Sequence, residues 1–147
     1  MNYDIIDATK LLSEFRSLNN YSAPFKIIGN YRMIDDGVDP EATVRIEAFG
    51  NQIYEASNGN GPVDALANVL KKGLTPLFRE ISDVNLVDYS ARIIDSKLGT
   101  ATTVMVEITF TNGQKLWKVY SSSENINAAS FNVLVDGFEF AIVSSSI

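Results

Sequence analysis

The chain contains an internal repeat, because residues 31–47 align without a gap on residues 91–107, sixty positions further along. Other aligned pairs exchange one apolar residue for another, as Met33 and Ile93 do. A single unit of this kind cannot bury its own apolar face, so two copies must pack together to close a core. The repeat therefore predicts two similar units. Because paired units of this kind often form a binding site at their junction, the repeat favours a binding or regulatory module. Six aligned pairs are identical: Arg32/Arg92, Ile34/Ile94, Asp35/Asp95, Thr43/Thr103, Val44/Val104 and Glu47/Glu107.

The composition excludes several classes of function. A net charge of −6 leaves no basic patch to neutralise phosphates, so we expect no nucleic acid partner. The chain has no histidine and no cysteine, which argues against a zinc site and excludes Ser-His-Asp and Cys-His nucleophiles. We therefore expect no metal and no cofactor, and any catalysis would fall to carboxylates, lysine or tyrosine.

The chain shows no sign of membrane insertion or export in its sequence. Its first residues lack the basic and apolar regions of a signal peptide. No uninterrupted apolar run approaches the roughly 18 residues that span a membrane. We therefore expect a cytoplasmic chain without a membrane partner.

Periodicity predicts a short helix over residues 7–18, with Asp7 as its cap. The run Asn-Asn-Tyr-Ser-Ala-Pro after this helix breaks the pattern. We therefore expect residues 1–24 to form a connector helix and linker. Residues 25–147 are expected to form one domain made of two repeats, 25–80 and 84–143.

Both repeats show the same order of expected elements. Asn112-Gly113 is a strong signal for a type I′ hairpin, and Gly50-Asn51 marks a tight turn in the first copy. The sequence predicts an α+β fold of two pseudo-symmetric β-β-β-α units, with antiparallel sheets covered by helices. The expected elements are strands 25–34, 43–48 and 53–57 with a helix from Pro62, then strands 84–95, 103–110 and 115–120 with a closing helix after a capping box at Ser121 and Glu124.

Several segments occur in an order that resembles a known family. They are Gly59-Asn60-Gly61-Pro62-Val63-Asp64-Ala65, Leu86-Val87-Asp88-Tyr89, Gly99-Thr100-Ala101-Thr102, Trp117, and Ser123-Glu124-Asn125-Ile126 with Ala129-Ser130. Over residues 25–143 this order resembles the C-terminal allosteric and dimerisation domain of the 2-isopropylmalate synthase and citramalate synthase family. The first two segments together are the most specific part of the resemblance.

The resemblance implies a regulatory domain that forms a homodimer and binds a branched-chain amino acid. The effector in the family is the pathway end product, leucine for isopropylmalate synthases and isoleucine for citramalate synthases. The family's acyltransferase activity belongs to a separate TIM barrel that holds a divalent metal partly by histidines. The chain is therefore expected to be the non-catalytic half, either a fragment or a stand-alone relative, with its barrel in the same parent chain or in a partner.

From the residues alone, the segment from Gly59 to Pro62 is either a strand-to-helix turn that needs positive φ or a place where backbone approaches a ligand carboxylate. Leu86, Tyr89 and Ile93 have the pattern of core-facing strand residues. The resemblance implies instead that these residues line an effector pocket, with the threonine-rich segment near residue 101 as its opposite wall. The effector-binding residues that it implies are Gly59, Asn60, Gly61, Val63, Asp64, Leu86, Tyr89, Ile93, Thr100, Thr102 and Thr103.

Two other interpretations of the chain stay open. One is a structural dimerisation module that has no effector site. The other is a small enzyme with a carboxylate pair such as Glu47 and Glu107, which we expect to face outward on their strands. Trp117 and Tyr120 are expected to belong to the sheet core or to a dimer interface. The acidic residues near Asp35 do not have the spacing of an EF-hand loop and are expected to form a solvated turn.

Overall fold

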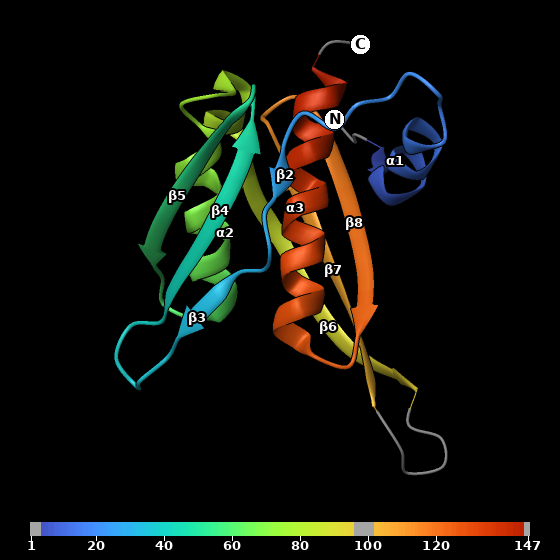
Figure 1. The fold of residues 1–147 in the computed structure, drawn as a ribbon. Coiled ribbons are helices and arrows are strands. Elements are labelled where there is room, and N and C mark those ends of the chain that lie inside the picture. Colours follow the sequence, from blue (N-terminus) through green and yellow to red (C-terminus); the bar gives the residue numbers. More distant parts are fainter. Residues whose placement is uncertain (1–3, 96–101, 146–147) are drawn as a thin grey trace.

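The computed structural model describes residues 4–95 and 102–145 (Figure 1). One sheet has the strand order β1-β8-β7-β6, and the other has β4 at its centre, with β2 and β3 on one side and β5 on the other. Only β1 runs parallel to its neighbour among the described strands. The elements are β1 (Ile5–Asp7), α1 (Ala8–Arg16), β2 (Lys26–Ile27), β3 (Arg32–Ile34), β4 (Glu41–Ala48), β5 (Asn51–Asn58), α2 (Pro62–Leu74), the 3₁₀ helix η1 (Arg79–Asp83), β6 (Asn85–Asp95), β7 (Thr103–Thr111), β8 (Leu116–Ser123) and α3 (Ile126–Ser144).

The structure confirms the predicted α+β class. Helix α2 packs against β4 and β5, and α3 packs against β7 and β8. The two helices also contact each other, so they lie together between the sheets (Figure 1). Each helix covers the sheet of its own unit, and the contact between the helices joins the two units into one core.

The first strand of the first repeat is broken, whereas the sequence predicted one strand over residues 25–34. Gly29 has φ of +70° and separates β2 from β3. The break also shifts the pairing with β4 by two residues, because Lys26 stands opposite Glu47 whereas Arg32 stands opposite Thr43. The corresponding strand in the second repeat, β6, runs without interruption for 11 residues.

The hairpin turns differ from the predicted ones. In the first unit the turn residues are Phe49 and Gly50, both with positive φ (54° and 78°), so the turn begins one residue earlier than expected. The type I′ prediction for Asn112-Gly113 is wrong, because Thr111 and Leu116 are opposite each other and leave four residues in the turn. The Asn112 side chain accepts hydrogen bonds from two backbone N–H groups of this turn and so stabilises the longer loop.

Helix α3 is the central helix of the core. Its N-cap is Asn125, whose side chain accepts hydrogen bonds from two backbone N–H groups, and the predicted capping box at Ser121 lies within β8 instead. Trp117 is fully buried and donates its indole N–H to the carbonyl oxygen of Gly137. Trp117 is therefore a core residue, one of the two roles expected for it.

By length and hydropathy alone, α3 could also cross a membrane, and it is the one such helix in the described part of the chain. The sequence prediction missed it because polar residues interrupt its apolar stretches. More than half of its apolar window is buried inside the chain (56%). This burial is what the core helix of a folded domain shows.

The N-terminal segment packs onto the second unit. Strand β1 adds to the sheet beside β8, and α1 contacts β8 and α3. Asp7 caps α1 as predicted, by accepting a hydrogen bond from the backbone N–H of Lys10, and Leu12 is fully buried. The division of the chain at residue 24 stays a prediction, although Ala8 and Leu12 of the N-terminal segment belong to the same hydrophobic core as the two repeats.

Candidate functional site

The segment that leads into α2 is built around a close approach of two backbones. A Cβ on Gly59 would lie 2.3 Å from the backbone nitrogen of Ala65, so a side chain does not fit there. Gly61 is the N-cap of α2 and has an extended backbone with open space around it. Neither glycine has positive φ, so the positive-φ turn, one of the two alternatives for this segment, is wrong. The carboxylate of Asp64 accepts a hydrogen bond from the backbone N–H of Asn60 at 2.8 Å and holds the loop against the helix.

A groove lies between α2, the start of β6 and α3. It has a volume of about 240 Å³, and it brings together two of the predicted residues, Asp64 and Leu86. Phe138 of α3 and Leu86 form its apolar part, and Asp64 and Lys71 bring a negative and a positive charge to its lining. The remaining lining residues are Ala67, Asn68, Val84 and Asn85.

Sequence reasoning missed Lys71 and Phe138. Lys71 lies seven residues after Asp64, two helical turns further along α2, so the helical period already placed both on one face. Its ammonium group donates to the carbonyl oxygen of Val84 at 2.7 Å and thereby joins α2 to the start of β6. The sequence places Phe138 only in the apolar stripe of the closing helix, and its position beside the groove depends on how the two units pack.

A β-bulge explains why Leu86 and Tyr89 share a face of β6. In a regular strand, residues three apart point to opposite faces. The pairing with β7 shifts between Leu86 and Asp88, so Val87 is the extra residue of a bulge. The result is that Leu86, Tyr89 and Ile93 stand opposite Phe110, Ile108 and Val104, the inward residues of β7.

Tyr89 joins β6 to the first half of α3. Its hydroxyl lies 3.0 Å from the Ser130 hydroxyl, and either oxygen can be the donor. Ser130 is fully buried, whereas Tyr89 is partly exposed. This hydrogen bond therefore satisfies a buried polar group and fixes β6 relative to α3.

Val63 lies in the first turn of α2 and packs against the core, whereas Ile93, Thr102 and Thr103 lie toward the far end of the β6–β7 hairpin. Figure 1 shows β6 and β7 extending past the N-terminal end of α3 and away from α2. Ile93 is 65% exposed, Thr102 is exposed, and Thr103 is half-buried. Thr100 lies outside the described residues. Within one copy, the structure therefore brings Asp64 and Leu86 together, but it does not bring Ile93 or Thr103 to the groove.

An ionic cluster connects the N-terminal segment to α3. Arg16, in the last turn of α1, donates to Asp136 at 2.8 Å and to Glu139 at 3.1 Å. Tyr21 donates its hydroxyl to the other carboxylate oxygen of Glu139, which is only 4% exposed. Burial raises the pKa of Asp136 and outweighs the opposite effect of the Arg16 charge. Burial and the bond to Glu139 raise the pKa of Tyr21 above its usual value.

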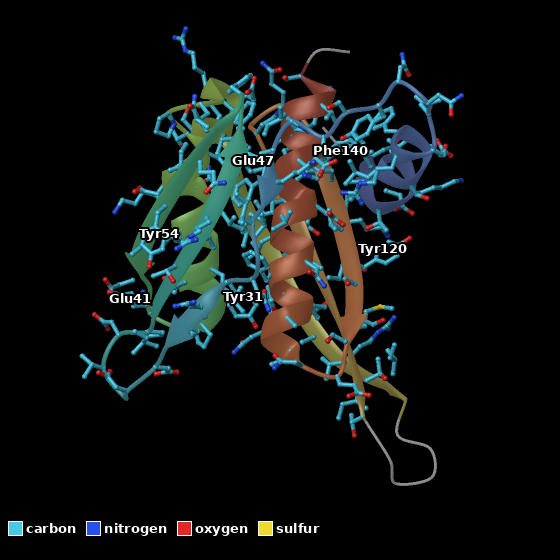
Figure 2. All side chains as sticks on the ribbon, viewed as in Figure 1. Tyr31, Glu41, Glu47, Tyr54, Tyr120 and Phe140 are labelled. Atoms are coloured by element: carbon cyan, nitrogen blue, oxygen red, sulfur yellow. The ribbon has the colours of Figure 1, made fainter. Side chains whose placement is uncertain are left out.

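The suggested carboxylate pair is not assembled in this chain. Glu47 lies on β4, whereas Glu107 lies on β7 of the other sheet. Figure 2 shows Glu47 on β4 and, well apart from it, Tyr120 on β8, the residue opposite Glu107. In the predicted acidic turn, Asp35 and Asp36 accept hydrogen bonds from backbone N–H groups two residues further along.

Comparison with protein families identifies the family of this chain. The family model for the LeuA allosteric (dimerisation) domain matches residues 7–142. The chain belongs to this family. The match begins at Asp7, so α1 and the linker after it fall within the LeuA domain as the family defines it. Membership in a dimerisation-domain family implies that the chain associates with itself.

Several relatives of this LeuA domain are (R)-citramalate synthases. The chain is 39% identical to the enzyme of Synechocystis sp. over 101 residues, which cover 69% of this chain and 18% of that protein. It is 33% identical to the enzyme of Geobacter sulfurreducens over 136 residues, 88% of this chain and 26% of that protein. A relative from Sulfolobus acidocaldarius is 27% identical over 99% of the chain, which spans 27% of that protein. The chain thus matches only the regulatory portion of these enzymes.

Proposed function

We propose that this LeuA domain is a non-catalytic regulatory module that binds a branched-chain amino acid in the groove between α2, β6 and α3. The observation that carries the proposal is the lining of that groove. Asp64 and Lys71 bring opposite charges to its lining beside the apolar surface of Leu86 and Phe138. A free amino acid with an apolar side chain presents the matching set of groups.

Each part of the effector has a partner in the groove. The α-ammonium group pairs with the carboxylate of Asp64, and the α-carboxylate pairs with the ammonium of Lys71. The branched side chain packs on Leu86 and Phe138, and burial of an aliphatic side chain contributes about 2 kcal/mol. Tyr89 is a positioning residue in this proposal, because its bond to Ser130 holds β6 against α3.

The homodimer completes the site in this proposal. Ile93 and Ile94 are 65% and 45% exposed on an edge strand, and a second copy packed against the hairpin would cover them. The threonines at residues 102 and 103 belong to the same hairpin. This packing would bring Ile93 and the threonines to the partner's groove as the wall that one copy lacks.

Feedback inhibition results if the effector favours one arrangement of the elements around the groove. Helix α3 contacts the effector through Phe138 and contacts α1 through the cluster of Arg16 with Asp136 and Glu139. A shift of α3 would therefore reach the connector and, through it, a citramalate or isopropylmalate synthase barrel in the same parent chain or in a partner. The coupling cannot exceed the effector's preference for one arrangement over the other. The cytoplasm is the proposed location.

The named relatives favour isoleucine over leucine as the effector. They are citramalate synthases, and the family resemblance links that branch to isoleucine. The competing function is a dimerisation module without an effector. One observation favours it, because the polar groups of Asp64, Lys71 and Tyr89 already have hydrogen-bond partners within the chain.

Isothermal titration of the 147-residue chain with isoleucine, leucine and valine tests the proposed function. The proposal expects saturable binding, with isoleucine tighter than leucine. A methyl group at the wrong position in a fitted pocket costs about 1–3 kcal/mol, so the difference should be about tenfold or more. If a folded dimer releases no heat with any of the three, the dimerisation module is the better account.

A further inference from the structure

The internal repeat creates a second junction that resembles the first. In the first junction, α2 of one unit lies beside the start of β6 of the other. In the second, α3 lies beside β2, the strand that the repeat aligns with the start of β6. Asn132 follows the N-cap of α3 by seven residues, as Asn68 follows the N-cap of α2. A groove therefore exists at each junction, but different residues line the two.

The second groove is larger and more polar than the first. Its volume is about 590 Å³, and it lies between the end of α1, β2, β8 and α3. Lys26 takes the position that the repeat aligns with Leu86, so an ammonium group replaces an apolar side chain. Its polar lining consists of Arg16, Lys26, Asn30, Ser121, Asn132, Asp136 and Glu139, and Glu139 is already bonded to Arg16 and Tyr21.

Two oppositely charged side chains in this groove have polar atoms that lack a hydrogen-bond partner among the described residues. Asp136 accepts from Arg16 through Oδ1, and within the described residues its Oδ2 atom has no hydrogen-bond partner. The Lys26 ammonium likewise makes no hydrogen bond or ion pair with any described residue, although Glu47 stands opposite it on β4. One free carboxylate oxygen and one free ammonium group thus line the same groove.

We propose that the groove between α3 and β2 is a second binding site, for a zwitterionic α-amino acid with a neutral polar side chain. The ligand's ammonium group pairs with Asp136 and its carboxylate with Lys26. Asn30, Ser121 and Asn132 supply hydrogen bonds for an amide or hydroxyl side chain. An aliphatic side chain would leave these groups unpaired, so this site should prefer a different class of amino acid from the first site. The proposal does not depend on whether the first groove binds an effector.

The test is a titration of the ¹⁵N-labelled 147-residue chain with glutamine, monitored by amide chemical shifts. Two analogues, N-acetylglutamine and glutaminamide, remove the ligand's ammonium and carboxylate charges one at a time. We expect saturable shifts centred on Lys26, Asn132 and Asp136, and each analogue should bind at least tenfold more weakly than glutamine. Lys26→Leu restores the residue of the other repeat and should weaken glutamine binding at least tenfold, whereas Lys115→Leu in an exposed turn should not change it.

A second variant separates this proposal from the proposed function. Leu86→Ala alters only the first groove, so glutamine should bind this variant as it binds the unaltered chain. The proposal is overturned if glutamine causes no saturable shift, if the shifts centre on Leu86 and Tyr89, or if Lys26→Leu binds glutamine with unchanged affinity. Loss of isoleucine binding alone would count against the first site and leave the second intact.

Discussion

At the scale of single residues, the two glycines before α2 are glycines for different reasons. Gly59 has no room for a side chain because the backbone of α2 passes beside it. Gly61 has both room and an extended backbone that any residue adopts. For both glycines the sequence left two alternatives open, positive φ in a turn or close approach of the backbone to a ligand. Only the path of the chain distinguishes the two positions.

This difference gives a matched pair of substitutions. Gly59→Ala should lower the free energy of unfolding by about 1–3 kcal/mol, because the added methyl group meets backbone that cannot move aside. Gly61→Ala should change it by less than about 0.5 kcal/mol. Urea denaturation of both variants measures the difference. Equal effects at the two positions would show that the close approach at Gly59 is not what selects glycine.

At the scale of elements, the attachment of α1 to α3 depends on a charged cluster. Arg16 sits between two carboxylates, one of which, on Glu139, is almost entirely buried. Removal of the guanidinium group would leave this buried charge with only the Tyr21 hydroxyl as its donor. The cluster is thus the polar part of the contact through which we propose that α3 acts on the connector.

Arg16→Met should therefore destabilise the domain. Breaking a fully buried ion pair costs about 3–5 kcal/mol, and the partial exposure of Arg16 reduces the expected loss to about 2 kcal/mol. Lys10→Met, an exposed position on the same helix, is the control and should change stability by less than about 0.5 kcal/mol. The prediction fails if the two variants denature at the same urea concentration.

Tyr21 should give the cluster a dependence on alkaline pH. Its pKa in the folded chain is raised above its ordinary value of about 10 by burial and by Glu139, so the folded state keeps this proton longer than the unfolded state does. The stability that this group contributes is complete below pH 10 and is lost as pH rises further. The unaltered chain and Tyr21→Phe should therefore differ less in their free energy of unfolding above pH 10 than below it. A constant difference between them from pH 8 to pH 11 would contradict the assignment.

The sequence predicted the order of the elements more accurately than the breaks and bulges within them. The order of strands and helices in each unit, the Asp7 cap and the burial of Trp117 all follow from local pattern. The break at Gly29 and the bulge at Val87 do not, because both depend on pairing with a partner strand. For the candidate site, the resemblance supplied Asp64 and Leu86. The helical period places Lys71 on the same face of α2 as Asp64, but only the packing of the two units brings that face beside β6.

At the scale of the whole molecule, one copy of the chain leaves an apolar hairpin uncovered. Ile93 and Ile94 are exposed on β6, an edge strand of its sheet. Family membership implies self-association, and we assign the contact to this hairpin. In the dimer, β6 and its neighbours would then contact the second copy, just as they contact the other unit within one chain. Each of these contacts would bring residues that are distant in the sequence to one groove.

Ile93→Asp should therefore shift the chain toward monomer. A charged residue in an apolar contact is left desolvated and unpaired, which opposes association. Val38→Asp, at an exposed position in the acidic turn of the first unit, is the control. Sedimentation equilibrium at micromolar concentration measures the mass of each variant. An unchanged dimer of Ile93→Asp would exclude this hairpin from the contact.

The central claim, that the groove between α2 and β6 holds a branched-chain amino acid, is tested most directly by isoleucine titration of two neighbouring variants. Leu86→Ala removes an apolar wall of the groove, whereas Val87→Ala changes the exposed extra residue of the bulge. The account predicts that isoleucine binds Leu86→Ala at least tenfold more weakly than the unaltered chain and binds Val87→Ala as before. Unchanged affinity in Leu86→Ala, in a chain that still binds isoleucine, would contradict it.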